Sequence, residues 1–98
     1  MSGRARSSGL LSEGTTIVSN TANTLSGVIV LSDAVNTATI TVYDHEAADR
    51  GTVLAKLVAT VGTGANSLAL ATPIRAENGL TVVVEGTGTP TGIILYGA

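Results

Sequence analysis

Cysteine, tryptophan and phenylalanine are absent from this sequence, and Tyr43 and Tyr96 are its only aromatic residues besides a single histidine. Without cysteine the chain can form neither a disulfide framework nor a thiolate metal site. With so few aromatic side chains for base stacking, and a net charge of -2, nucleic-acid binding is not expected. The core must therefore be built from aliphatic side chains.

Charged residues are also scarce, making up 12% of the 98 residues, whereas hydrophobic residues make up 44%. A chain of this length forms one domain, and a domain of this size is only marginally stable by itself. Few charges are left to keep a large free surface soluble. We therefore expect part of the surface to be covered by partner proteins or by other copies of the chain.

The N-terminal segment, residues 1–14, is rich in Ser, Gly and Arg and shows no hydrophobic periodicity. It predicts a flexible arm that precedes a folded domain over residues 15–98. Such an arm can become ordered on a neighbouring subunit, so its basic and apolar residues are candidate partner contacts: Arg4, Arg6, Leu10 and Leu11. The chain shows neither the apolar run of a signal peptide nor a segment of membrane-spanning length, so we expect a product of the cytoplasm without membrane contact.

From residue 15 onward, short runs of β-branched residues alternate with Gly, Asn, Asp and Pro, a pattern typical of strands and turns. In the clearest run, VNTATITVY, Ala38, Ile40 and Val42 point to one side of the strand and the threonines to the other. The predicted strands lie at residues 15–20, 26–32, 35–43, 51–61, 67–71, 80–85 and 92–97. About seven short strands in one small domain predict an all-β fold, a single compact antiparallel β-sandwich or jelly roll with a flexible N-terminal arm.

The run GTVLAKLVATV at residues 51–61 fits two patterns. Its residues Val53, Ala55, Leu57, Ala59 and Val61 alternate as in a strand, but its apolar residues also fit a helical stripe. The initial glycine and the many β-branched residues lower helix propensity, and GTGAN follows as a turn. We therefore predict a strand.

The segment between the strands at 35–43 and 51–61 collects the polar residues in which chemistry is conceivable: Asp44, His45, Glu46, Asp49 and Arg50. Carboxylates and an imidazole can bind a metal, but the spacing matches neither a calcium loop of the EF-hand type nor a zinc site. An acid–base pair with His45 is disfavoured because adjacent residues of an extended chain point apart, and no nucleophile motif accompanies it. We interpret the segment as a solvated loop with an exposed tip that can contact a partner.

The order ITVYD, a charged loop, GTVLAKL and then PIRAENGLTVVVEGTGTPTGIILYG resembles the small β-sandwich virion proteins of tailed bacteriophages. The resemblance covers about residues 25–98, and its pieces mark strands and turns, not catalytic residues. It implies a non-enzymatic structural protein, of the capsid decoration or head–tail accessory type, present in many copies on a particle.

On this resemblance we expect a capsid decoration (cement) protein that binds the outer surface of the shell of major capsid protein and stabilises it. Its expected partners are the major capsid protein or other virion proteins and further copies of itself, with a trimer as one arrangement, and its expected location is the virion. No catalytic residue, cofactor or metal is expected. Two alternatives stay open: a tail, neck or fibre-attachment component, and a ligand- or metal-binding module built on the loop from Asp44 to Arg50.

Overall fold

The computed structural model describes residues 6–33, 35–46, 51–62 and 64–97. They form eight strands, and the prediction of an all-β fold is confirmed. The strands are β1 (Arg6–Ser7), β2 (Gly14–Ser19), β3 (Asn23–Leu31), β4 (Ala38–Asp44), β5 (Thr52–Ala59), β6 (Ala65–Ala76), β7 (Leu80–Gly86) and β8 (Thr91–Gly97). In these ranges no helix reaches the length and hydrophobicity needed to cross a membrane.

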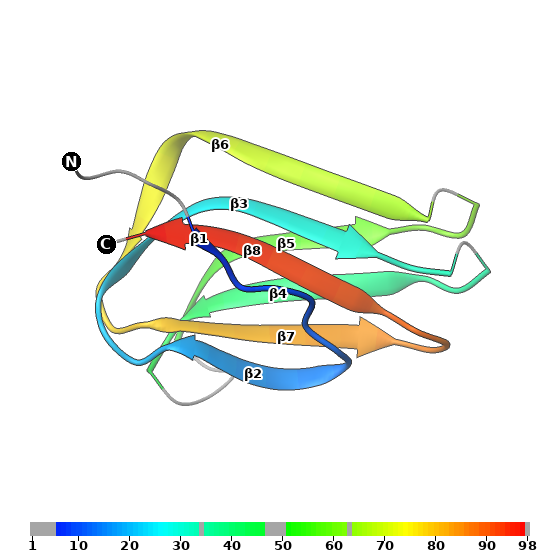
Figure 1. Ribbon diagram of the computed structural model, residues 1–98, viewed down its shortest axis with the longest axis horizontal. Helices are drawn as coiled ribbons and strands as arrows, with labels where there is room; N and C mark the ends of the chain where they lie inside the picture. Colours follow the sequence, from blue (N-terminus) through cyan, green and yellow to red (C-terminus); the bar gives the residue numbers. More distant parts are fainter. Residues whose placement is uncertain (1–5, 34, 47–50, 63, 98) are drawn as a thin grey trace.

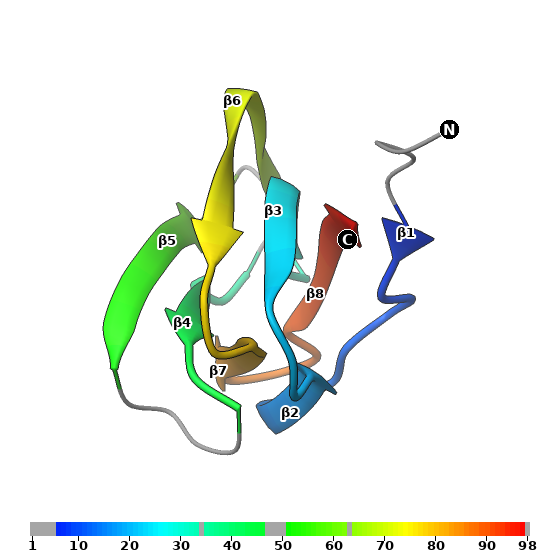
Figure 2. The same ribbon diagram turned by 90° about the vertical axis from the view of Figure 1, so that its left-hand side faces the viewer.

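The strands form two four-stranded antiparallel sheets that face each other. Sheet A has the order β1-β8-β3-β6 and sheet B the order β2-β7-β4-β5. Consecutive strands mostly lie in opposite sheets, except that β4 and β5 are paired neighbours, as the sequence predicts for the runs on either side of the charged loop. This strand order is that of a jelly roll, a sandwich of two Greek keys. Figure 2, which views the molecule end-on, shows the two layers.

The core between the sheets is aliphatic throughout. Its fully buried side chains come from the central strands of both sheets, and Ile40 and Val42 of β4 face Val28 and Val30 of β3 across the sandwich. The buried set also contains Leu11, Leu25, Ala38, Ala55, Ala59, Ala76, Leu80, Val82, Val84 and Ile94. Branched aliphatic side chains fill such a layer well because they pack closely on a pleated surface.

Besides a register shift between Ile17 and Ser19 where β2 pairs with β7, two irregularities shape the sheets. Between the pairs Leu25↔Ile74 and Gly27↔Ala69, β3 has one residue and β6 has residues 70–73, so β6 bulges and bends along the edge of sheet A (Figure 1). Pro73, which has no N–H to donate, lies in this bulge on an edge strand, where proline is tolerated. A bulged edge with a proline resists pairing with a strand of another molecule.

The second irregularity changes the prediction for β5. The predicted strand is confirmed, and Ala55, Leu57 and Ala59 face the core side. The register shifts between Val42 and Tyr43, however, so Val53 pairs with Tyr43 and is half exposed, while Leu54 packs against the core. A β-bulge reverses the face of every residue beyond it, and a simple alternation of residue types does not reveal it.

The segment predicted as a flexible arm is partly built into the sandwich. Arg6 and Ser7 pair with Tyr96 and Leu95 of β8, and the main chain of Leu11 exchanges two hydrogen bonds with Gly92, with N–O distances of 2.7 and 2.9 Å. Leu11 itself is buried in the core. Over residues 6–14 the chain therefore forms the edge of sheet A and the crossing to β2, while residues 1–5, with Arg4, lie outside the described residues.

The two sheets approach each other closely at Gly92, the second residue of β8. A Cβ atom built on Gly92 would lie 2.6 Å from Ile40 Cδ1 and 3.0 Å from Val84 Cγ2, both in sheet B. Glycine is therefore required here by the packing of the opposite sheet.

We predict that Gly92→Ala lowers the free energy of unfolding by about 1–3 kcal/mol because the added methyl group overpacks the core. Ile40→Val, which removes Cδ1, costs about 0.5–1.5 kcal/mol alone but relieves the clash, so the double variant loses less than the sum. Urea unfolding of the four proteins measures this coupling. Ile94→Val, equally buried but not among the atoms nearest to the added methyl group, serves as the control. Strict additivity of Gly92→Ala and Ile40→Val would contradict the assigned contact.

Candidate assembly surface

The structure places the predicted partner-contact residues in three different situations. Arg6 is exposed on β1 and Leu10 is 70% exposed, whereas Leu11 is buried in the core and therefore cannot contact a partner. Asp44 ends β4, His45 is half-buried beside it, and Glu46 is exposed. Asp49 and Arg50 lie outside the described residues, as does Arg4.

Asp44 holds two loops together. Its carboxylate accepts hydrogen bonds from the backbone N–H groups of the turn that joins β6 to β7: Asn78 at 2.8 Å, Glu77 at 3.1 Å and Gly79 at 3.4 Å. The contact links parts of the chain that are more than thirty residues apart in sequence. Asp44 therefore caps a turn within the fold, and its contact with a partner stays a prediction.

Further contacts hold the segment after β4 against the turn at residues 77–79, an arrangement that we call the Asp44 clamp. The Thr81 hydroxyl of β7 donates a hydrogen bond to the carbonyl oxygen of His45 at 2.9 Å. Gly79 is buried, and a Cβ atom on it would lie 2.5 Å from the Ser19 carbonyl oxygen and 3.0 Å from that of His45. The Asn78-Gly79 turn is thus closed over by the segment after β4, at the end of the molecule seen in Figure 2.

The same hydrogen bonds affect the pKa of the Asp44 carboxyl group. Burial by itself raises the pKa of the carboxyl group, but the backbone N–H groups of Asn78, Glu77 and Gly79 stabilise the charged form and lower the pKa below its usual value of 3.8. The metal-binding hypothesis needs the same carboxylate oxygens. Within the described residues no three His, Cys, Asp or Glu side chains form a group that could hold a metal ion.

We predict that Asp44→Asn lowers the free energy of unfolding by about 1–2 kcal/mol at neutral pH, because it removes the charge that accepts three N–H groups. Glu46→Gln removes the same charge from an exposed side chain two residues away and is expected to change stability little. Chemical denaturation of both variants checks this. Equal losses from the two substitutions would contradict the clamp.

The difference in stability between the native protein and Asp44→Asn is expected to depend on pH. Because the folded-state pKa of Asp44 lies below 3.8, its contribution is complete above that value and disappears as pH falls through the folded-state pKa. Asp33, whose pKa is lowered by its hydrogen bonds to Asn36 and Val35, is present in both proteins and cancels in the comparison. Denaturation curves between neutral and acidic pH measure the difference, and a constant difference would contradict the assignment.

The most unusual surface is the outer face of sheet A. On β3, Val28 and Val30 point into the core, so Ile29 and Leu31 point outward. On β8, Ile94 is buried and Ile93 and Leu95 point outward. The outward residues of β6 in the paired stretch are small. We call this surface the aliphatic face; it comprises Gly27, Ile29, Leu31, Ala65, Ser67, Ala69, Thr91, Ile93 and Leu95.

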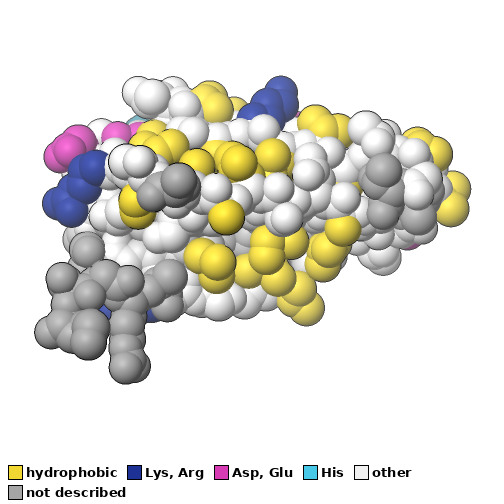
Figure 3. Space-filling model, turned by 90° about the horizontal axis from the view of Figure 1, so that it is seen from above, with side chains coloured by type: hydrophobic (Ala, Val, Ile, Leu, Met, Phe, Trp, Pro, Cys, Tyr) yellow, Lys and Arg dark blue, Asp and Glu magenta, His cyan; other side chains and the backbone are white. Residues whose placement is uncertain are grey.

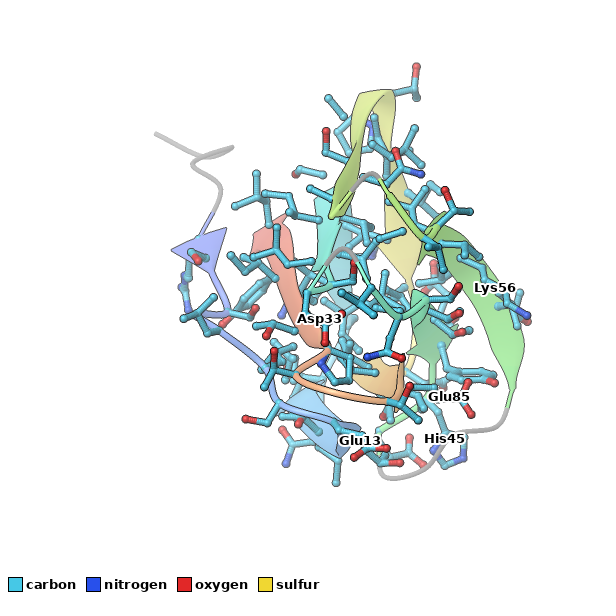
Figure 4. The ribbon with its side chains drawn as sticks, turned by 90° about the vertical axis from the view of Figure 1, so that its right-hand side faces the viewer. Glu13, Asp33, His45, Lys56 and Glu85 are labelled. Carbon is cyan, nitrogen blue, oxygen red and sulfur yellow. The ribbon has the colours of Figure 1, made fainter. Side chains whose placement is uncertain are left out.

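No residue of the aliphatic face carries a charge. Outer faces of antiparallel sandwiches are normally polar, because one side of each sheet meets water. The outer face of sheet B is mixed: it carries exposed Lys56 of β5 and Glu85 of β7 beside the threonines of β4, together with the exposed hydrophobic residues Ile17, Val53 and Val58. Figure 4 shows Lys56 and Glu85 on the side of sheet B, away from β8 and β1.

A shallow hollow of about 230 Å³ lies in the aliphatic face. It forms where Gly27, which has no side chain, pairs with Ala69 on one side and Leu95 on the other. Its lining residues are Ser26, Gly27, Val28, Ile29, Ser67, Leu68, Ala69 and Leu95. Figure 3, which looks onto the β6 edge, shows hydrophobic side chains along the middle of the molecule and charged groups mostly near one end.

Sequence reasoning missed this face as a site. The runs SGVIVLS and GIILYG contain the signal, because they are apolar at both odd and even positions, unlike a strand with one solvated side. Comparisons with protein families, curated proteins and solved structures found no match for this chain.

Proposed function

We propose that this protein is a non-enzymatic structural subunit of a bacteriophage virion, a decoration protein that covers and stabilises the outer surface of the capsid shell. The aliphatic face is the observation that carries the structural part of this proposal. A contiguous apolar surface on a small protein marks an interaction site, because water disfavours leaving it exposed. The virion setting rests on the resemblance of residues 25–98 to small phage proteins.

The distribution of polar groups also favours assembly over chemistry. The hydrogen-bonded carboxylates of Asp44 and Asp33 act within the fold, on the 77–79 turn and on residues 35 and 36, respectively. The hollow at Gly27 is shallow and its lining side chains are aliphatic or small, apart from two serine hydroxyls. Such a surface provides shape and apolar contact, which is what a subunit of a repetitive shell requires.

The jelly roll suits a subunit that must keep its own fold while it is bound to a shell. In sheet A the short strand β1 covers part of β8, and the β6 edge is bulged and contains Pro73, so pairing with another molecule is limited along the edges of this sheet. A decoration protein must keep its own fold while it binds through faces, and the rigid paired strands hold the side chains of the aliphatic face in fixed positions.

We predict that virions assembled without this protein lose their genome at a lower temperature than complete virions, because a cementing subunit stabilises the shell it covers. Thermal release of DNA, followed with a fluorescent dye, measures the effect, and adding back the purified protein restores the higher temperature. A density map of complete virions is expected to show many copies on the shell.

Val83→Lys, which changes the outer face of sheet B, provides a comparison with Ile93→Lys, which changes the aliphatic face; both residues are half-buried on interior strands. We expect only Ile93→Lys to fail in the add-back. A few copies at a single vertex or along the tail would favour the tail or neck alternative, and absence of the protein from purified virions would overturn the proposal.

A further inference from the structure

We propose that the aliphatic face binds a second copy of this chain, and that the two copies pack sheet A against sheet A about a twofold axis. This inference rests on the proposed function only in treating the face as an assembly surface. It deepens that role, because the aliphatic face joins two copies and the dimer then contacts the shell through its other surfaces. It identifies the occupant by three properties of the face: its lack of charge, its hollow, and the arrangement of its side chains in rows.

The lack of charge makes the face compatible with itself. In a twofold interface each residue meets the same patch of the other copy, so any charged residue near the axis meets its own like charge. None of the nine residues of the aliphatic face is charged, and the exposed Arg75 of sheet A lies outside them, beyond the end of the face at Gly27, whereas Lys56 and Glu85 lie within the paired rows of sheet B. Burial of aliphatic surface on both sides then favours association without a desolvation cost for ions.

The side chains form three rows across the strands. The first row has Leu95, Gly27 and Ala69, the second has Ile93, Ile29 and Ser67, and the third has Thr91, Leu31 and Ala65. On β3 the rows therefore run from the hollow at Gly27, through Ile29, to the large side chain of Leu31. One end of the face is hollow at Gly27, and the other carries the larger, half-buried side chain of Leu31.

A twofold axis that crosses the strands at the second row matches these two ends. It places the first row of one copy against the third row of the other, so Leu31 of each copy meets the hollow at Gly27 of its partner. Ile29 and Ile93 then lie opposite their own counterparts in the middle of the interface. Two aligned sheets packed in this way repeat the face-to-face packing that already forms the core.

The first test is the mass of the protein in solution. We expect sedimentation equilibrium over a concentration series to give twice the 9.7 kDa mass of one chain. Ile29→Lys places two like charges opposite each other at the centre of the interface and is expected to weaken dimerisation by about 100-fold or more. Val83→Lys, on the outer face of sheet B, is expected to leave the dimer unchanged. Far-UV circular dichroism shows whether each variant retains its strands.

The second test reads the symmetry directly. Because the chain has no cysteine, Ile29→Cys introduces a unique thiol that lies opposite its own copy. Facing sheets lie about 10 Å apart, too far for a direct disulfide, so a short bismaleimide is used as the cross-linker. We expect Ile29→Cys to give a covalent dimer and Val83→Cys to stay uncross-linked under the same conditions.

A monomeric or trimeric native protein, a folded Ile29→Lys variant that still dimerises, or cross-linking of Val83→Cys alone would each overturn the twofold arrangement. These outcomes are independent of the proposed virion function. A monomer found in many copies on virions refutes the dimer and supports decoration. A symmetric dimer absent from virions supports the dimer and refutes decoration.

Discussion

The close packing of two sheets through aliphatic side chains is the constraint on which the rest of this structure depends. The chain has no Phe or Trp, and Tyr96 only packs against the edge of the core, so the sheets approach closely; at Gly92, the Ile40 and Val84 side chains of sheet B leave no room for a Cβ atom on β8. Close-packed interiors tolerate little change in volume, so the absence of a side chain at Gly92 allows this close approach at the start of β8.

The core packing uses only one side of each strand, so the residues on the outer faces indicate what those faces contact. Sheet B has a mixed outer face, in which threonines, Lys56 and Glu85 lie beside exposed Ile17, Val53 and Val58. Sheet A has a second layer of aliphatic residues on its outer side, and Ile29 and Ile93 lie side by side there. These outward side chains contribute little to the internal core, so we relate them to contact with another protein surface.

The strands were largely predictable, because alternation and turn residues are local signals: all seven predicted runs overlap a strand, including β5, for which a helix was an alternative. The face of Val53 was not predictable, because it depends on a bulge where β5 pairs with β4. The paired state of residues 6–11 was missed for a similar reason, since β1 and Leu11 gain order only from β8 at the far end of the chain. The same holds for Asp44. Its polar side chain could be singled out from the sequence, but its hydrogen-bond partners at positions 77–79 could not, because they come from a remote segment.

The sequence by itself determined the class of the fold, the aliphatic nature of the core and the positions of the turns, because these follow from residue type and periodicity over a few neighbouring positions. Only the tertiary structure decided the order of strands in the two sheets, the engagement of Asp44 by a distant turn and the existence of one continuous aliphatic face. Each of these arises where segments remote in sequence are brought together by hydrogen bonding across a sheet. The face joins Ile29 to Ile93, more than sixty positions apart, and no local pattern encodes which strands will be neighbours.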